Sequence, residues 1–233
     1  MGIRLLEKRE KENNREYAYR TLRENIMTLE LPPGETLNEN ELAEKMKVSR
    51  TPVHEAILML KEEALAEVYP QSGSRVSRLE VERLNEGYFL RLQVEPEIMR
   101  QIAGNLSSEE IMAFKQNLKY QSEALKREDY LDEFYRLDEE FHHMIYRFSR
   151  KETIWRAVKN VCSHYDRVCY LDGMMSRAGV ELREQENRAL YRILLTGQEP
   201  EGSPQSFCCE KYLSAYKKNF GEILEAYAEY FNI

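Results

Sequence analysis

The sequence contains little glycine and proline, with 10 Gly and 7 Pro among 233 residues. Both fall below average usage of roughly 7% and 5%, and the many tight turns of β-sandwiches and barrels depend on these two residues. Helix-favouring Leu, Glu, Lys, Arg and Ala are abundant by contrast. The composition therefore predicts a mainly helical protein, and the length suits one large domain or two small ones.

Paired cysteines and long apolar runs are also missing. The four cysteines, Cys162, Cys169, Cys208 and Cys209, form no CxxC pair, and a bridge between the two adjacent ones would be strained. The N-terminal 14 residues lack the apolar core of a signal peptide, and no run of about 18 apolar residues occurs. These absences predict a soluble, reduced, cytoplasmic protein with no membrane partner.

An excess of positive charge is absent too, since 34 Lys and Arg face 41 Asp and Glu, for a net charge of -7. Taken alone, this value argues against a nucleic-acid partner. Residues 1–78, however, carry 13 basic and 14 acidic side chains, whereas residues 79–233 carry 21 and 27. The acidity belongs mainly to the second region, so the first region can still bind DNA, through a few well-placed contacts.

The first region has the pattern of three short helices and a hairpin. Apolar residues recur at helical spacing before Leu31-Pro-Pro-Gly34, which ends the first helix. Asn38, with Glu41 three residues later, is a candidate cap of the second helix. Ser49 or Thr51 can cap the third, and short alternating runs then flank a turn at residues 70–73. This order predicts a winged helix-turn-helix, whose third helix enters the major groove.

Several phrases in this region carry a family resemblance. They are Leu31-Pro-Pro-Gly-Glu-Thr-Leu, Glu41-Leu-Ala, Val48-Ser-Arg-Thr-Pro-Val and the Pro70/Gly73/Val76 wing. Together, in this order, they resemble the DNA-binding domain of GntR-family bacterial transcription regulators. The family usually has Arg after the Thr-Pro-Val triplet, whereas this sequence has His54. Because His has fewer donors than Arg, a different or weaker base preference is expected.

The second region shows no strand-like alternation and divides into about six helices. The expected segments are 80–104, 107–127, 130–148, 151–175, 179–196 and 206–232, with breaks that include Gly173. Short connections predict an all-α bundle. The phrase Asp138-Glu-Glu-Phe-His142 and the helix order resemble the FCD effector-binding domain of one large GntR subfamily. We therefore expect a DNA-binding domain over residues 1–78 and an FCD-type effector-binding and dimerisation domain over residues 79–233.

The candidate DNA contacts lie at the start of the third helix and at the wing. Hydroxyls and an Arg at a helix N-terminus can reach phosphates or a guanine edge, and Gly73 allows close backbone approach. The alternative is that Ser49 and Thr51 only cap the helix and that Arg50 is a solvated charge. The predicted DNA-binding residues are Ser49, Arg50, Thr51, His54, Gly73, Ser74 and Arg75.

Asp138 and His142 lie four residues apart, so both project from one face of their helix, beside apolar side chains. A divalent metal would satisfy both groups. The FCD resemblance implies two further His ligands, but the matching positions read Asn187 and Tyr212. A tight Zn or Ni site is therefore predicted to be degraded. The four residues are expected to form a hydrogen-bonded polar cluster, with a weakly bound metal as the alternative.

Arg91 falls on the apolar stripe of its helix, where a guanidinium suits bidentate capture of a carboxylate ligand. The alternative is an internal pair of Arg91 with Glu95. Arg183 and Tyr191 flank Asn187 at helical spacing and could line the same cavity. The resemblance implies an organic-acid effector, since many FCD domains sense organic acids. Cys208 and Cys209, three and four residues before Tyr212, could also supply a soft metal ligand.

These features predict a bacterial transcription regulator, acting as a repressor. A homodimer would bind a pseudo-palindromic double-stranded DNA operator, and a small organic acid would modulate binding. One alternative is a regulator with a vestigial sensor that acts through dimerisation or a protein partner. The least favoured alternative is a metal-dependent bundle enzyme. The sequence has no phosphate loop, dinucleotide glycine motif or nucleophile paired with a base, so no catalytic residue is predicted.

Overall fold

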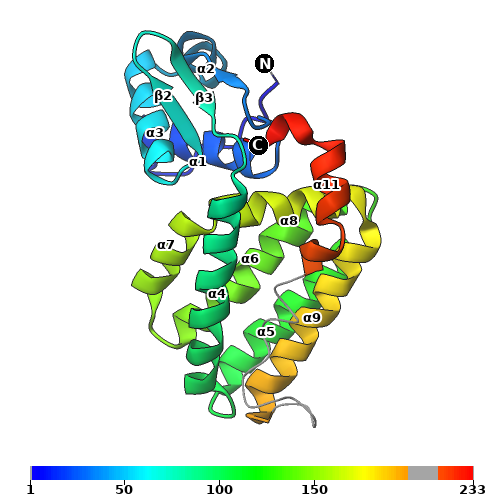
Figure 1. The fold of residues 1–233 in the computed structure, drawn as a ribbon. Coiled ribbons are helices and arrows are strands. Elements are labelled where there is room, and N and C mark those ends of the chain that lie inside the picture. Colours follow the sequence, from blue (N-terminus) through cyan, green and yellow to red (C-terminus); the bar gives the residue numbers. More distant parts are fainter. Residues whose placement is uncertain (1, 199–214, 233) are drawn as a thin grey trace. The chain divides into compact units, whose positions relative to one another are not determined.

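A computed structural model describes residues 2–198 and 215–232 (Figure 1). The chain forms two compact units. The first comprises Met1–Gly87, Lys159–Val168 and Leu224–Ile233, and the second comprises Tyr88–Val158 and Cys169–Ile223. The expected fold class, a winged helix-turn-helix followed by an all-α bundle, is confirmed. None of the described helices combines the length and the apolar character needed to cross a membrane.

The first unit begins with the winged helix-turn-helix. Its helices and strands are α1 (Asn14–Met27), β1 (Thr36–Leu37), α2 (Glu39–Met46), α3 (Arg50–Glu62), β2 (Ala66–Tyr69) and β3 (Gly73–Val76). Asn38 caps α2 as predicted, because its side chain accepts from the backbone N–H groups of Asn40 and Glu41. Ser49 takes the N-cap position of α3 but makes no side-chain cap hydrogen bond. Its hydroxyl therefore stays available for another partner.

The three helices and the sheet enclose one apolar core. The fully buried residues include Leu22 and Ile26 of α1 and Val53 and Ile57 of α3. Their spacing of three or four residues places them on one face of each helix. This packing fixes the direction of α3 within the unit. The opposite face of α3 is left to the solvent, where Arg50, Thr51 and His54 are exposed.

The wing is part of a three-stranded antiparallel sheet with strand order β1-β3-β2. In the predicted hairpin, Ala66 pairs with Val76 and Tyr69 pairs with Gly73. Strand β1 adds a third member, in which Thr36 pairs with Arg75. The two-residue β1 was not predicted, because only its pairing with β3 makes it a strand. Gly73 has a φ of 88°, a left-handed conformation that suits glycine.

The segment that follows the wing is tied down by a buried arginine. Arg167 is fully buried and donates from Nη1 to the backbone oxygen of Ser77 at 2.8 Å, and from Nη2 to the Ser77 hydroxyl at 3.0 Å. Two residues on, Leu79 forms a bridge with Phe231. The N–H of Glu80 donates to Nδ1 of His164 at 3.0 Å. The residues after the wing are thus held by segments distant in sequence within the first unit.

The helices that follow are α4 (Val81–Ile102), α5 (Ser108–Ala124), α6 (Tyr130–Phe148), α7 (Glu152–Val161), α8 (Ser163–Met175), α9 (Arg177–Thr196) and α11 (Phe220–Ala226), with short 3-10 helices at Ala215–Lys218 and Ala228–Tyr230. In the second unit, α5, α6 and α9 pack side by side, with α4 along the same bundle (Figure 1). The rings of Phe114, Phe134 and Phe141 are fully buried within it. Polar side chains on the inner faces of these helices therefore meet in the bundle interior.

Three expectations about these helices were wrong. The segment 151–175 is not one helix, because α7 ends at Val161 and α8 begins at Ser163. Gly173 does not break a helix but lies inside α8, where a Cβ would come within 2.7 Å of the Tyr135 hydroxyl. The described part of the predicted helix 206–232 is divided among the two 3-10 helices and α11. Its remainder, with Cys208, Cys209 and Tyr212, lies outside the described residues.

Candidate DNA-binding surface and effector site

The exposed N-terminal turn of α3 carries four of the predicted DNA contacts. Ser49, Arg50, Thr51 and His54 are all exposed. These side chains stand where the positive end of the helix dipole favours a phosphate. Because the Ser49 side chain makes no cap bond, the interpretation in which it serves only as a cap loses its support. The turn offers hydroxyl, guanidinium and imidazole groups for contacts to DNA.

A carboxylate that the sequence reasoning missed lies beside this turn. Glu39, the first residue of α2, accepts from Nε of Arg50 at 2.6 Å and contacts Nδ1 of His54 at 2.8 Å. Burial raises the pKa of the Glu39 carboxyl, but His54 and Arg50 outweigh burial and lower it below its usual range. The carboxylate is therefore ionised at neutral pH. No local spacing links Glu39 to residues 11 and 15 positions later, so the sequence offered no signal for this contact.

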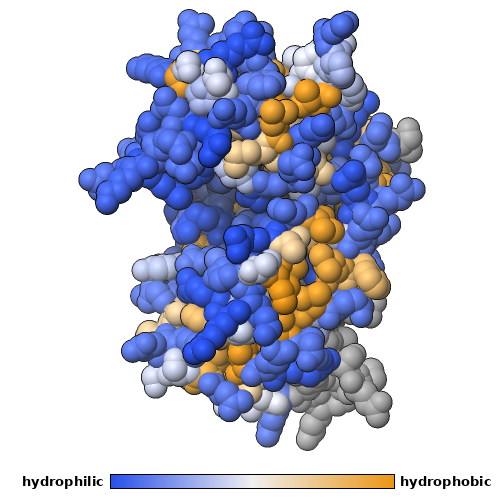
Figure 2. All heavy atoms as spheres, turned by 90° about the vertical axis from the view of Figure 1, so that its left-hand side faces the viewer, coloured by the Kyte–Doolittle hydropathy of each residue, from blue (hydrophilic) through white to orange (hydrophobic). Residues whose placement is uncertain are grey.

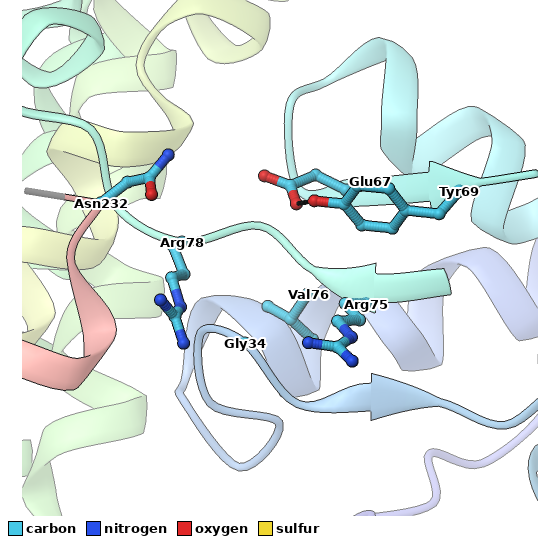
Figure 3. Close-up of a pocket in the computed structure, with 7 residues that line it drawn as sticks. All are labelled: Gly34, Glu67, Tyr69, Arg75, Val76, Arg78 and Asn232. Carbon is cyan, nitrogen blue, oxygen red and sulfur yellow. Dashed lines mark hydrogen bonds between the residues drawn. The ribbon is translucent and has the colours of Figure 1, made fainter. Parts of the chain in front are cut away.

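The predicted wing contacts differ in their exposure. Gly73 and Arg75 are exposed, whereas Ser74 is only 4% exposed because side chains alternate along β3 and that of Ser74 lies on the buried face of the sheet. Beside them lies a hollow of about 190 Å³ that Figure 3 shows. It is lined by Gly34, Glu67, Tyr69, Arg75, Val76, Arg78 and Asn232. Two guanidinium groups therefore stand at this surface, a placement that suits a phosphate.

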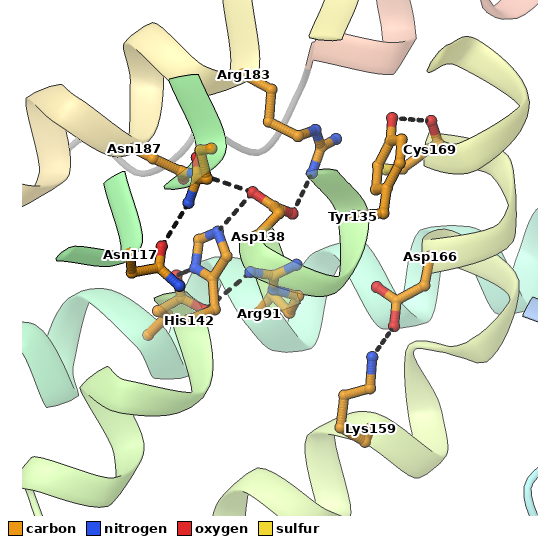
Figure 4. A network of polar contacts seen from close by, with 12 residues as sticks. Arg91, Asn117, Tyr135, Asp138, His142, Lys159, Asp166, Cys169, Arg183 and Asn187 are labelled. Carbon is orange, nitrogen blue, oxygen red and sulfur yellow. Dashed lines mark hydrogen bonds and ion pairs between the residues drawn. The ribbon is translucent and has the colours of Figure 1, made fainter. Parts of the chain in front are cut away.

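The predicted effector residues come together in the second unit, on three helices (Figure 4). Helix α4 contributes Arg91, α6 contributes Asp138 and His142, and α9 contributes Arg183 and Asn187. All five are at most 5% exposed. The faces predicted from helical spacing are thus the inner faces of the bundle, where these polar groups contact one another.

Asp138 accepts hydrogen bonds from α9. Nδ2 of Asn187 donates a hydrogen bond to its Oδ1 at 2.7 Å, and Nη1 of Arg183 donates to its Oδ2 at 3.4 Å. Asn187 also donates to Gln121 on α5 at 3.1 Å. Burial raises the pKa of the Asp138 carboxyl, but Arg183, His142 and Asn187 outweigh burial and lower it below its usual range. The ionised carboxylate therefore links α6 to α9.

Glu95, one turn after Arg91 on α4, is the other acceptor. Its Oε1 lies 2.5 Å from Nδ1 of His142. Its Oε2 accepts hydrogen bonds from Nη2 of Arg91 at 3.2 Å and from the Tyr146 hydroxyl at 3.4 Å. Burial raises the pKa of the Glu95 carboxyl, but His142 and Arg91 lower it well below its usual range. The internal Arg91–Glu95 pair, considered as an alternative role for Arg91, is therefore present. Its contact with His142 was not predicted, because α4 and α6 are distant in sequence.

The geometry around His142 bears on the metal question. Its Nε2 lies 3.8 Å from Oδ1 of Asp138, and Nδ1 faces Glu95. Within residues 2–198 and 215–232, no three His, Cys, Asp or Glu side chains are placed to hold a metal ion. A metal on Asp138 would also have to displace the donors of Arg183 and Asn187. The described residues therefore do not fit a Zn or Ni site, and Tyr212 lies outside them.

Tyr191 lies one turn beyond Asn187 on α9 and is 9% exposed. Its ring centroid lies 6.1 Å from that of Phe114. Among the described residues, its buried hydroxyl has no hydrogen-bond partner. A buried hydroxyl without a partner is costly, and a bound ligand or water would satisfy it. Tyr191 thus adds a donor to the side of the bundle that holds Asn187.

Comparisons with known proteins agree with this architecture. The model of bacterial regulatory proteins of the gntR family matches residues 14–76, and the FCD domain model matches residues 86–202. A helix-turn-helix transcriptional regulator in an unstable DNA locus of Streptomyces ambofaciens is 35% identical over 187 residues, which are 80% of this chain and 78% of that protein. The transcriptional repressor RspR of Escherichia coli strain K12 is 28% identical over 92% of both chains.

Solved structures show the same fold. The structure described as E. coli McbR/YncC has a TM-score of 0.74 at 19% sequence identity, over 93% of this chain and 99% of that one. The family and its relatives are transcription regulators, not enzymes. With the winged helix-turn-helix matched by one family model and the helical domain by another, the chain belongs to the GntR family of bacterial transcription regulators, in its FCD-containing branch.

Proposed function

We propose that the chain is a repressor that binds a pseudo-palindromic operator as a homodimer, and that a small carboxylate metabolite bound in the FCD domain modulates this binding. GntR regulators bind DNA operators and act as dimers, and one relative is named as a repressor. The proposal assigns operator contact to α3 and the wing. It assigns effector contact to the inner faces of α4, α6 and α9.

The exposed N-terminal turn of α3 is the observation that carries the DNA-binding part. Ser49, Arg50, Thr51 and His54 face the solvent on a helix whose other face is buried in the core. Arg50 is 67% exposed along its side chain, so it can leave Glu39 and reach a guanine edge or a phosphate. The wing then places Gly73 and Arg75 against the adjacent DNA backbone.

Selection from a random double-stranded DNA library tests this part, because the selection itself identifies the operator sequence. We expect the wild-type chain to enrich a two-fold symmetric sequence. Arg50→Ala should weaken binding to that sequence by about tenfold or more, as expected for loss of a base contact. Arg15→Ala removes the same charge from an exposed position on α1 and serves as the control. Equal affinity of the two variants would remove Arg50 from the site.

The effector part rests on the two buried guanidinium groups of the second unit. Arg91 and Arg183 are 5% and 4% exposed, and each contacts an ionised carboxylate across a hydrogen-bonded network. A carboxylate ligand could exchange with Glu95 or Asp138 as the partner of a guanidinium fork. The buried hydroxyl of Tyr191 would supply a further donor. Exchange of partners between α4, α6 and α9 would change how these helices pack, which is how ligand binding could bias a regulator.

A second candidate function is a regulator without a small-molecule effector. The same network favours it, because Glu95 and Asp138 already compensate the buried guanidinium charges. In that case the polar network serves only the packing of the bundle. The chain would then respond through dimerisation or a protein partner.

A thermal-shift screen over organic acids separates the two functions. A ligand that binds the folded state raises the melting temperature, by an amount set by its concentration and affinity. We expect one class of organic acid to stabilise the wild type. Arg91→Lys should lose that response, because an ammonium cannot hold a carboxylate in a bidentate pair. Arg100→Lys, at an exposed position of α4, is the control. No stabilising acid would favour the second function.

The dimer is proposed to form through α4. Figure 2 shows apolar atoms gathered on one face of the helical domain, on the side where Figure 1 places α4 and α7. Phe89 on α4 is 63% exposed and Ile154 on α7 is 38% exposed. Exposed apolar surface of this kind is typical of an interface. Burial of this surface would stabilise a homodimer, and the dimer would bring two winged helices to one operator.

A further inference from the structure

The contact of Glu39 with the recognition helix specifies more than a surface ion pair. One carboxylate contacts two predicted DNA-reading side chains, since Oε2 receives Nε of Arg50 at 2.6 Å and Oε1 lies 2.8 Å from Nδ1 of His54. The Glu39 side chain is only 15% exposed, whereas those of His54 and Arg50 are 49% and 67% exposed. Glu39 is therefore the fixed member, and the two other side chains extend from it toward the solvent.

The contact with Glu39 determines which nitrogen of the His54 ring carries the hydrogen. An ionised carboxylate can only accept, so the hydrogen of this contact must sit on Nδ1 of the imidazole. In the neutral ring, Nε2 is then the nitrogen without a hydrogen and is an acceptor. Nε2 is separated from Nδ1 by one ring carbon, so its lone pair points in a different direction from the Nδ1–H that contacts Glu39. The exposed end of His54 therefore presents an acceptor, whereas the Arg usual at this position of the family presents only donors.

Base edges in the major groove distinguish an acceptor from a donor. Adenine N6 and cytosine N4 donate there, whereas guanine N7 and O6 accept, as does thymine O4. An Arg therefore selects guanine, and an acceptor selects an amino group. We propose that Glu39 is a specificity-determining positioning residue: by holding Nδ1–H of His54, it makes Nε2 read an adenine or cytosine amino group in the operator. This inference rests on the proposed role of α3 in DNA contact.

The competing interpretation is that Glu39 only connects α2 to α3 and stabilises their packing. In that case its loss would destabilise the winged helix and weaken binding to every DNA sequence alike. A positioning role instead changes the base preference at one position of each half-site. Glu39→Gln keeps the shape of the side chain, but its amide can donate as well as accept. The His54 ring can then adopt either tautomer, and the preference for an amino group should relax.

The experiment is selection from a random double-stranded DNA library at pH 8, where an ordinary histidine is neutral. The chains compared are the wild type, Glu39→Gln, His54→Arg and, as matched control, Glu44→Gln, which changes an exposed Glu of the same helix. We expect the wild type to prefer adenine or cytosine over guanine by about fivefold or more at one position of each half-site. His54→Arg should enrich guanine at that position. Glu39→Gln should lose the preference there and keep the rest of the operator, and Glu44→Gln should match the wild type.

Each result decides the matter. If the wild type enriches an operator but Glu39→Gln keeps the same preference at every position, the positioning role is overturned while DNA binding stands. If Glu39→Gln weakens binding to all sequences without changing the enriched one, Glu39 only stabilises the packing of α2 against α3. If the wild type enriches no sequence, the proposed DNA contact itself fails and the inference with it. Circular dichroism confirms that each variant is folded, and His54→Arg tests the same position without altering Glu39.

Discussion

Glu95 is the residue on which the buried charges of the FCD domain converge. It is fully buried and contacts His142, Arg91 and Tyr146 from two helices. Burying a carboxylate in a bundle interior costs several kcal/mol unless its hydrogen-bonding capacity is used. Here both oxygens are used, and the pKa of the carboxyl lies well below its usual range because His142 and Arg91 outweigh burial. The ionised form is therefore part of the native structure.

We expect Glu95→Gln to lower the free energy of unfolding at pH 7 by about 3–5 kcal/mol, because it removes one charge from a buried pair. The folded-state pKa values of Glu95 and Asp138 are lowered, so their contribution to stability is complete above about pH 5 and is lost as pH falls through the folded-state values. Urea unfolding between pH 7 and pH 3 should thus show less acid sensitivity in the variant than in the wild type. Glu86→Gln, exposed on α4, is the control. Equal acid sensitivity would contradict this role.

Asn187 is the residue at which the metal question can be tested. It donates to Asp138 at 2.7 Å, and Asp138 lies 3.8 Å from Nε2 of His142. Asn187→His would replace an amide with an imidazole beside two potential ligands, and three protein ligands suffice for zinc. We expect added Zn or Ni to raise the melting temperature of this variant more than that of the wild type. Asn187→Gln supplies no imidazole and should behave as the wild type. An equal rise in melting temperature in all three chains would contradict the view that Asn187, in place of a histidine, prevents tight metal binding.

Helix α8 ties the wing to a distant part of the chain through one side chain. Arg167 is fully buried, yet in the described part of the chain its hydrogen bonds go to Ser77 and to the backbone of Ser163 rather than to a carboxylate. Burial lowers the pKa of Arg167 to about 9, and Glu67 and Glu80 raise it by less. The Arg167 guanidinium holds the segment after β3 through two hydrogen bonds, since it donates to both the backbone oxygen and the hydroxyl of Ser77.

Loss of this side chain should loosen the segment after the wing. We expect Arg167→Ala to lower the free energy of unfolding by roughly 2–4 kcal/mol, because it leaves a cavity and an unsatisfied Ser77 oxygen. Hydrogen exchange at residues 73–80 should become faster in the variant. Arg156→Ala, exposed on α7, should change neither quantity. Unchanged exchange at residues 73–80 in Arg167→Ala would show that the segment is held by other contacts.

At the scale of elements, what could be predicted depended on how local the determinants are. The range predicted for α6, 130–148, equals Tyr130–Phe148 because a strong apolar stripe defines it. The break between α7 and α8 falls at Cys162, with no Gly or Pro to announce it. Strand β1 depends on β3 for its existence, and the contacts of Glu39 and Glu95 join distant segments. Inner faces could thus be predicted from periodicity, but partners across helices could not.

At the scale of the whole molecule, the two family domains impose a requirement on assembly. A two-fold symmetric operator presents two half-sites, and a single chain carries one winged helix. Linking two winged helices in one dimer raises operator affinity by avidity, without any new base contact. Since residues 1–78 carry almost no net charge, nonspecific attraction to DNA is modest. Dimerisation should therefore account for much of the operator affinity of this protein.

The exposed apolar face of α4 makes that dependence measurable. Phe89→Asp places a charge on the proposed interface, and burying an unpaired charge is costly. We expect light scattering to give a mass near 27.7 kDa for this variant and twice that value for the wild type. Its affinity for a full operator should fall about a hundredfold or more, while its affinity for a single half-site stays unchanged. Met112→Asp changes an equally exposed apolar residue, 63% exposed on α5, and should remain a dimer. If Phe89→Asp stays dimeric, α4 does not form the interface.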